Sequence, residues 1–484
     1  MEVQSKQFIA LADIGIHNTD QRAAVLKGTT NAHTKRLAAM YASGQEYGEA
    51  LRQQAAEARR RALRNLPDLL EQAEANMTAN GMHVLWAESP ADANRLMLEI
   101  AARHDVQRVA KAKSMLTEEL GVNHALEAAG IEVTETDLGE WIIQLNDEAP
   151  SHIIAPVIHK SKESIVEVFR EKVNYTGSTD ATEMAAFARE KLRRVFLEAD
   201  MGISGGNFIV AETGTFGLVT NEGNGRMVTA MPRVHVAFIG IEKVVETLDD
   251  YSLLTQLVAR AGTGQVMTVY TQMIGGPRRD GEPDGPDHVY VILVDNGRTK
   301  IYATEYAEAL ACIRCGACQN ACPVYQNTGG HAYGWVYGGP IGAVITPLLT
   351  GLENASPLPY ASTLCGACKQ ACPVDIDLPR MLLDLRRDIV DAGISGQGWG
   401  AGLFLWGVGN RNPALFGFGG FAARTAINSA PIIKKLLPPP LSGWTDYRDF
   451  PDFAPKPFRD LWQERQKRKS NGANGADKDQ HHDA

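Results

Sequence analysis

The pattern of hydrophobic and polar positions divides the chain into three stretches of different character. Residues 1 to about 80 are rich in strong helix formers, so we expect them to be helical. From about residue 82, short apolar runs alternate with helical stretches, an order typical of a sheet covered by helices on both faces. After residue 300, cysteine, glycine and proline dominate to about residue 380. The pattern therefore predicts a helical segment, an α/β domain and a third domain of another kind.

Short apolar runs in the middle stretch are predicted to be strands. They lie at residues 83–87, 108–113, 131–136, 151–155, 202–213, 217–222, 234–240, 265–271 and 288–295. Helices are expected after the first run, to about residue 103, and after the second, opening at Ser114. The economical assignment is one three-layer α/β domain with a mixed or parallel sheet.

Changes of composition suggest where the domains end. We expect a helical segment at 1–64, the α/β domain at 65–300, a cysteine-rich domain at 301–390, a C-terminal segment at 391–465 and a tail at 466–484. The tail is polar and of low complexity, so we expect it to be disordered. Its His481 and His482 are interpreted as a tail feature and not as a metal site.

An apolar stretch at 398–427 lies within the C-terminal segment. Asn410, Arg411, Asn412 and Pro413 interrupt it, and a membrane-spanning helix needs about 20 unbroken apolar residues. We therefore expect a packed or interfacial helical segment without a transmembrane helix, and peripheral contact with a membrane or a partner stays open.

Composition and charge exclude several classes of protein. Hydrophobic content of 44% and charged content of 22% are ordinary for a globular chain. A net charge of −9 without a clustered basic face argues against a nucleic-acid binder. The N-terminus lacks a basic stretch followed by a long apolar run, so we expect no signal peptide and a cytoplasmic protein.

All seven cysteines lie in two motifs of similar spacing, CIRCGACQNACPVYQ and STLCGACKQACPVDIDLP. They are Cys312, Cys315, Cys318, Cys322, Cys365, Cys368 and Cys372. An odd number confined to one part of the chain argues against a disulfide framework. The first motif follows C-x2-C-x2-C-x3-C-P, which is typical of iron–sulfur clusters. A zinc site would use two close pairs of ligands and would leave this spacing unexplained.

In crossed ligation, three cysteines of one motif hold a cluster together with the last cysteine of the other motif. The first cluster would then have Cys312, Cys315, Cys318 and Cys372, a full set for [4Fe-4S]. The second cluster would have Cys322, Cys365 and Cys368, and Ser362 stands in the position of the fourth ligand.

Three outcomes are open for the second cluster. It could be [4Fe-4S] with Ser362 or another oxygen as ligand, [3Fe-4S] with three cysteines, or [4Fe-4S] with an exchangeable water on one iron. In the last case the open iron could bind substrate as a Lewis acid.

With these motifs in place, the chain resembles the lactate utilization protein B family. The similar segments are residues 109–145, 329–349, 362–379 and 446–462. The resemblance implies a LUD domain, related in fold to sugar-phosphate isomerases and coenzyme A transferases, and a mainly α-helical dicluster ferredoxin-like domain with seven cysteine ligands. It also implies the iron–sulfur subunit of an NAD-independent system of three proteins that oxidises L-lactate to pyruvate, so two partner proteins are expected.

Two segments of the α/β domain could form a pocket for a small anion. Lys111 and Lys113 come at a strand end and precede Ser114, a possible N-cap, where backbone N–H groups favour a carboxylate. The second segment, residues 205–235, is rich in glycine. Its candidates are Glu212 as an acidic catalytic residue and Arg226, Arg233 and His235 as sources of charge. The alternative is structural: a capped helix with solvated lysines, tight turns and a packed histidine.

The sequence has no fingerprint for an organic redox cofactor. No G-x-G-x-x-G follows a strand and no P-loop is present. Because iron–sulfur clusters accept one electron at a time, we expect an electron-transfer subunit that is an incomplete dehydrogenase on its own. Two alternatives stay open: a self-sufficient 2-hydroxy-acid oxidoreductase, and a redox-sensing scaffold without turnover.

Overall fold

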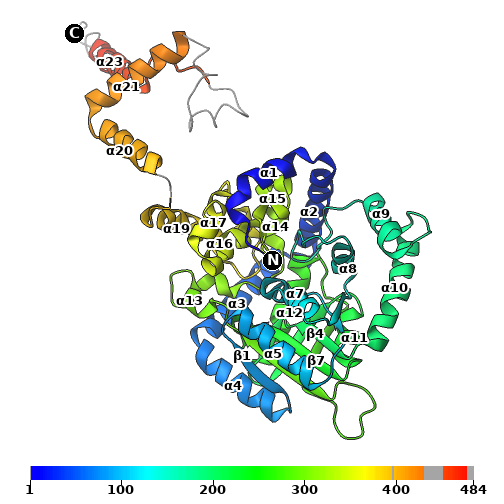
Figure 1. The fold of residues 1–484 in the computed structure, drawn as a ribbon. Coiled ribbons are helices and arrows are strands. Elements are labelled where there is room, and N and C mark those ends of the chain that lie inside the picture. The colour runs from blue at the N-terminus through cyan, green and yellow to red at the C-terminus, as the bar shows by residue number, and fades with distance from the viewer. Residues whose placement is uncertain (1, 395–396, 430–450, 477–484) are drawn as a thin grey trace. The chain divides into compact units, whose positions relative to one another are not determined.

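The structure, a computed structural model, describes residues 2–394, 397–429 and 451–476. The chain divides into two compact units, Met1–Ile394 and Ser395–Ala484, and each is described by itself. The first unit contains the α/β core together with the cysteine motifs (Figure 1).

A parallel sheet of six strands forms the centre of the first unit, in the order β1-β10-β7-β4-β2-β3. The strands are β1 (His83–Ala87), β2 (Arg108–Lys111), β3 (Glu132–Glu135), β4 (Met201–Gly205), β7 (Val234–Gly240) and β10 (His288–Val294). The central strands β7 and β10 are almost continuous apolar runs because both of their faces are covered. The predicted parallel-sheet α/β core is confirmed.

The two faces of this sheet pack against different partners. In β10, Tyr290 and Ile292 pack with helices α5 (Pro90–Arg103), α6 (Met115–Leu120) and α7 (Val122–Ala128). Val289 and Val291 point to the other face and pack with α4 (Leu66–Ala79) and with a second sheet. Near β2 and β3 the cover is completed by α8 (Leu138–Leu145), α9 (Lys162–Val173), α10 (Ala181–Glu198) and α11 (Asn224–Ala230).

The second sheet was not expected from the sequence. Its order is β8-β5-β6-β9, and its strands are β5 (Phe208–Val210), β6 (Thr215–Thr220), β8 (Val244–Val245) and β9 (Tyr270–Ile274). The single strand predicted at 202–213 is in fact β4 and β5, which belong to different sheets. The strand predicted at 265–271 begins only at Tyr270, and the short β8 was missed.

The strand predicted at 151–155 is wrong. This apolar run forms bends, and its polar groups bind the cysteine-rich segment: the Ile153 N–H donates to Gln319, and His152 pairs with Asn320 at 3.1 Å. Apolar character here reflects burial between two parts of the unit, which a strand pattern alone does not distinguish from burial in a sheet.

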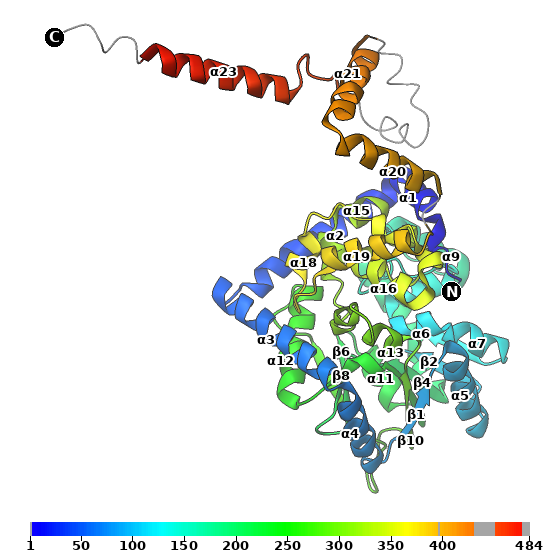
Figure 2. The same ribbon diagram turned by 90° about the vertical axis from the view of Figure 1, so that its left-hand side faces the viewer.

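The N-terminal helices are α1 (Phe8–His17), α2 (Thr19–Met40) and α3 (Gln45–Arg64), preceded by the 3-10 turn η1 (Ser5–Gln7). Helices α1 and α2 pack against α14 (Ala317–Ala321) and α15 (Pro323–Thr328) of the cysteine-rich segment (Figure 1). Helix α3 packs along α12 (Leu248–Gly262) and β8 (Figure 2). The first 64 residues therefore join the α/β core to the cysteine motifs.

The cysteine-rich segment is mainly helical. Its elements are α13 (Arg298–Tyr302), η3 (Ala307–Ala311), α14, α15, η4 (His331–Tyr333), α16 (Gly339–Thr350), α17 (Leu352–Ala355), η5 (Leu358–Tyr360), α18 (Ala367–Ala371) and α19 (Leu378–Asp391). Helix α16 lies in the middle and packs against α14, α17 and α19.

The second unit contains helices α20 (Gln397–Arg411), α21 (Pro413–Ser429) and α23 (Phe458–Ala476). Asn412 separates α20 from α21, and its Oδ1 accepts the Ala414 N–H at 2.9 Å. None of the helices in the described ranges combines the length and apolar character that crossing a membrane requires. Helix α23 continues to residue 476, inside the stretch expected to be disordered. His481, His482 and the start of the 446–462 segment lie outside the described residues.

Candidate functional site

The first cysteine motif forms a tight loop followed by two short helices. Arg314 and Gly316, on either side of Cys315, have left-handed φ angles of +58° and +72°. Helix α14 follows and carries Cys318, and Cys322 then ends α14 and precedes Pro323 at the start of α15. The proline fits at this position because the first turn of a helix needs no N–H donor.

The second motif repeats this conformation. Leu364 and Gly366 lie on either side of Cys365 with φ angles of +54° and +83°. Helix α18 then carries Cys368 and ends at Cys372. Helices α14 and α18 pack against each other, so the two motifs form a pair of similar loops and helices.

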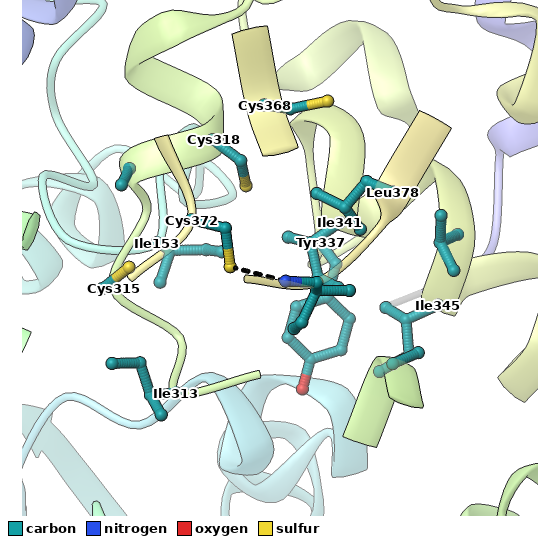
Figure 3. Packing of buried hydrophobic residues seen from close by; sticks show 14 of the residues in the cluster. Ile153, Ile313, Cys315, Cys318, Tyr337, Ile341, Ile345, Cys368, Cys372 and Leu378 are labelled. Atoms are coloured by element: carbon teal, nitrogen blue, oxygen red, sulfur yellow. Dashed lines mark hydrogen bonds between the residues drawn. The ribbon is translucent and has the colours of Figure 1, made fainter. Parts of the chain in front are cut away.

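The cysteine side chains fall into two groups. Burial, together with the neighbouring Cys372 and Cys312, raises the pKa of Cys315 to about 12. Burial likewise raises the pKa of Cys318 above its usual range, with Cys312 and Cys315 adding to the shift. Figure 3 shows the side chains of Cys315, Cys318 and Cys372 close together, whereas the sulfur of Cys368 points away from them.

The second group consists of the remaining cysteines. Burial raises the pKa of Cys368 to about 12, and Cys322 and Cys365 both add to this shift. Cys318 of the first group also lies near Cys368 of the second, because Cys368 adds to the rise in the pKa of Cys318. Because a negative charge on one thiol disfavours a charge on its neighbour, these couplings identify which sulfurs lie near one another. The grouping is the one that crossed ligation requires.

The protein surrounds the sulfurs with backbone donors. The Arg314 N–H donates to Cys312 Sγ at 3.4 Å. The Ile376 N–H donates to Cys372 Sγ, also at 3.4 Å, and Figure 3 marks this bond at the Cys372 sulfur by a dashed line. A backbone hydrogen bond from Ala317 lowers the pKa of Cys315, which burial otherwise raises. Such donors stabilise the thiolate form that a metal requires, and hydrogen bonds to sulfur also tune cluster potential.

The spacing of the sulfurs fits a cluster better than a single ion. Within the ranges that the structure describes, no three His, Cys, Asp or Glu side chains converge closely enough to hold one metal ion. The spacing of the two motifs instead suits thiolates that bind separate irons of one cluster. The residues present therefore fit an iron–sulfur cluster.

The two groups differ in exposure. In the first group Cys312 is half-buried and the other three cysteines are buried, whereas in the second group Cys322 and Cys368 are buried and Cys365 is exposed. The side-chain hydroxyl of Thr363 binds Cys365 and lowers its pKa. The second group therefore reaches the surface of the first unit, and the first group lies deeper.

A cavity of about 390 Å³ lies at the carboxyl ends of strands β2, β4 and β7. Its wall includes Ala112 to Leu116 after β2, Gly205 to Asn207 at the end of β4, and Gly240 at the end of β7. Ligands of open α/β sheets bind at this edge. The cavity brings together the two segments that the sequence suggested for a small-anion pocket, and the first cysteine loop adds Ile313 and Arg314 to its wall.

Four cations and several acids line this cavity, and the cations are Lys113, Lys243, Arg298 and Arg314. Lys243 donates to the Cys312 carbonyl at 3.1 Å, and Lys113 donates to the Ile154 carbonyl at 2.6 Å. The Arg314 guanidinium lies 4.3 Å from the ring centre of Tyr337, and its Nη1 has no hydrogen-bond partner. The acids are Asp137, Glu222 and Glu242.

Glu222 and Glu242 do not titrate alike. Burial and the neighbouring Asp137 raise the pKa of Glu222, which favours its neutral form. Burial by itself would raise the pKa of Glu242, but the positive charges of Arg298, Lys243 and Arg314 lower it to about 2. Glu242 therefore keeps its charge. The cavity thus offers both positive charge and carboxyl oxygens.

Lys111 lies outside the cavity wall, although it comes only two residues before Lys113. It is fully buried and pairs with Glu118 at 2.9 Å and with Glu135. Ser114 does line the cavity, and its side chain caps α6 by accepting the Thr117 N–H at 3.4 Å.

The other predicted residues lie outside the cavity and have structural partners. Glu212 accepts the Leu248 N–H at the start of α12 at 3.0 Å. Arg226 lies 5.2 Å from the ring centre of Tyr270, and Arg233 donates to the His104 carbonyl. His235 is buried in β7 and pairs with Ser204 at 2.8 Å. Burial lowers the pKa of His235 to about 3, so this ring is neutral.

Sequence reasoning missed Lys243 and Arg314. Arg314 stands between two ligand positions of the cysteine motif, and the spacing of the motif identifies only the cysteines. Lys243 lies in the short turn between β7 and β8, which no pattern marks as functional. Arg314 reaches the cavity because the cysteine loop folds onto the edge of the sheet, whereas Lys243 lies there because it closely follows the end of β7.

Comparisons with known proteins agree with this architecture. Family models match residues 70–294 as a LUD domain, residues 308–376 as a 4Fe-4S dicluster domain and residues 402–467 as the C-terminal region of lactate utilisation protein B.

Relatives named lactate utilization protein B match almost end to end. The protein of Anoxybacillus flavithermus is 42% identical over 96% of this chain and 99% of its own length. That of Bacillus velezensis is 41% identical over 97% of this chain and 99% of its own. That of Oceanobacillus iheyensis is 43% identical over 97% and 98%, respectively. This chain therefore belongs to the lactate utilization protein B family.

Proposed function

We propose that this protein is the iron–sulfur electron-transfer subunit of a cytoplasmic, NAD-independent complex that oxidises L-lactate to pyruvate with two partner proteins. The observation that carries the proposal is the division of the cysteines into two neighbouring groups in a family linked by name to lactate utilisation. Cys312, Cys315, Cys318 and Cys372 would hold one [4Fe-4S] cluster. Cys322, Cys365 and Cys368 would hold the second cluster.

Oxidation of a 2-hydroxy acid to a 2-oxo acid releases two electrons and two protons. When bound, the two clusters supply two one-electron acceptor sites. The protein contributes the buried thiols and the backbone N–H donors, which exclude water and set the relative potentials. The exposed Cys365 suits the second group to exchange electrons with a partner.

A second candidate role is that the chain itself binds the substrate, which the cavity favours. Lys113 and Arg314 could bind a carboxylate, and Asp137 could accept the proton of a hydroxyl group. In this role the protein would be a self-sufficient 2-hydroxy-acid oxidoreductase.

Reconstitution under anaerobic conditions distinguishes these roles. The purified chain is mixed with L-lactate, alone and with its two partner proteins, and bleaching of the cluster absorbance is followed. Bleaching only with the partners supports the electron-transfer subunit, and bleaching of the chain alone supports the self-sufficient enzyme. Intact clusters that L-lactate reduces in neither mixture would refute both roles and favour a redox-sensing scaffold.

Substrate binding in the cavity has its own test. Calorimetric titration with L-lactate and pyruvate compares the wild type with Lys113→Met and with a control, Lys191→Met, whose lysine contacts only the Phe187 ring among the described interactions. Binding weakened at least tenfold by the first substitution alone supports this site. Equal binding by all three proteins would contradict it.

A further inference from the structure

The first positions of the two cysteine loops differ in chemistry, because Cys312 in one corresponds to Ser362 in the other. We infer that Ser362 Oγ is the fourth ligand of the second cluster, bound as an alkoxide to the one iron that lacks a cysteine. The inference deepens the proposed function, since it rests on the presence of that cluster.

The backbone supports this equivalence. The residue two positions after the first ligand position is left-handed in both loops, with φ of +58° at Arg314 and +54° at Leu364. The glycine two positions further on is left-handed in both as well, and a five-residue helix follows each loop. The two loops therefore direct their first side chains in corresponding ways.

The hydrogen bonds of the two side chains also correspond. The Arg314 N–H donates to Cys312 Sγ at 3.4 Å, and the Leu364 N–H donates to Ser362 Oγ at 3.1 Å. The shorter distance is that expected for an oxygen acceptor in place of sulfur. Ser362 Oγ thus receives the backbone donor that corresponds to the one on Cys312 Sγ.

A simple serine turn would explain the hydrogen bond but not the backbone. A left-handed conformation is unfavourable for a non-glycine residue such as Leu364. A turn that only satisfied the serine hydroxyl would not need this conformation. In the first loop the same conformation follows Cys312, a predicted cluster ligand. Ligation by the first residue would explain the conformation in both loops.

The backbone at Ser362 is held by Arg386. Arg386 of α19 donates to the Pro359 carbonyl at 2.9 Å and to the Ser362 carbonyl at 3.3 Å. The same guanidinium lies 5.0 Å from the ring centre of Tyr360. These contacts hold the loop in place without using the Ser362 side chain, so its hydroxyl stays directed by the loop itself.

Ligation changes the charge of the serine in a definite way. The O–H bond breaks, its proton goes to solvent, and an O–Fe bond forms, with no change in oxidation state. An alkoxide is a harder and more basic donor than a thiolate, so it favours the ferric state. The second cluster is therefore expected to have a lower reduction potential than the same cluster with four cysteines.

The test uses the full chain, purified anaerobically, as wild type, Ser362→Ala, Ser362→Cys and a control, Ser356→Ala, from the preceding turn. Iron and sulfide content, electron paramagnetic resonance and reductive titration are measured. Two [4Fe-4S] clusters contain about eight irons per chain. We expect the wild type and the control to contain this number and the alanine variant to contain about one iron fewer, with the signal of an oxidised [3Fe-4S] cluster. The cysteine variant should keep all its iron and raise the potential of one cluster.

Two results would overturn the inference. One is an alanine variant with the iron content and spectrum of the wild type, which is expected if water holds the fourth iron. The other is a cysteine variant whose two potentials are unchanged, and this measurement decides the matter even if the alanine variant does not accumulate. Absence of iron from the wild type would instead refute the proposed function, so the two failures are distinguishable.

Discussion

Arg59 provides the most direct test of how the N-terminal helices support the cysteine loop. It lies on α3 and is fully buried. Its guanidinium donates to four backbone carbonyls. They belong to Val244 at 2.8 Å, Leu310 at 3.1 Å, Ala311 at 3.3 Å and Glu242. One side chain therefore binds the second sheet and the residue that precedes Cys312.

The magnitude follows from these four acceptors. Burial lowers the pKa of Arg59 to about 10, so it remains charged near neutral pH. Arg59→Met keeps most of the volume but leaves buried carbonyls without a donor, each costing about 1–3 kcal/mol before relaxation. Partial rearrangement leaves a net loss of about 3–5 kcal/mol in the free energy of unfolding, as for other broken buried charge networks.

Urea unfolding of the anaerobic holoprotein, followed by circular dichroism, measures this loss. The control is Arg64→Met on the same helix, because Arg64 is exposed and pairs with the exposed Glu57. Exposed ion pairs contribute little, so the control should resemble the wild type. A loss below about 1 kcal/mol for Arg59→Met, or equal losses for both variants, would refute the reasoning.

Three further predictions concern residues whose roles the structure changed or defined. His235 is neutral when folded, with a pKa of about 3, and its unfolded pKa is near 6.5. As pH falls below 6.5, the unfolded state therefore binds a proton on His235 that the folded state does not bind. This lowers the free energy of unfolding by about 2 kcal/mol at pH 5. His235→Gln should flatten the pH dependence of the unfolding free energy over this range, and an unchanged slope would contradict it. Glu212→Ala should cost about 1 kcal/mol by removing the acceptor of the Leu248 N–H, and it should leave lactate oxidation by the reconstituted complex unchanged. A tenfold fall in that rate would restore Glu212 as a catalytic candidate. Gly366→Ala should cost about 1 kcal/mol through its φ of +83° alone, since an added Cβ meets nothing within 4 Å. Its iron content should match the wild type, and loss of iron would show that the loop tolerates no strain.

Strong local signals explain what the sequence could predict. Strands β7 and β10 are long apolar runs with covered faces, and their positions were predicted within a residue. The cysteine spacing likewise reflects local geometry, because the ligands of one loop must reach neighbouring irons. In the structure the helices that follow the two cysteine loops, α14 and α18, pack against each other.

Failures occurred where distant parts of the chain decide the environment. Residues 151–155 are apolar because they are buried against the cysteine-rich segment, and no local pattern separates this from a strand. Lys111 and Lys113 have similar sequence surroundings, yet one is enclosed by Glu118 and Glu135 and the other faces the cavity. The contribution of Arg314 to that cavity depends on a loop about 200 residues away in sequence from Lys113, which local reasoning cannot supply.

The packing of the first residues against the cysteine-rich segment has a consequence for the order of assembly during translation. Ser5 donates to the Tyr333 carbonyl across 328 residues of sequence. At about 5–20 residues per second, a ribosome needs roughly 16–66 s to make the intervening chain. During this interval α1 and α2 lack the cysteine-rich segment as a packing partner, so the apolar faces that contact it stay exposed. Iron is then delivered to the cysteines late in synthesis, when the N-terminal helices and the cysteine-rich segment of this unit first come into contact.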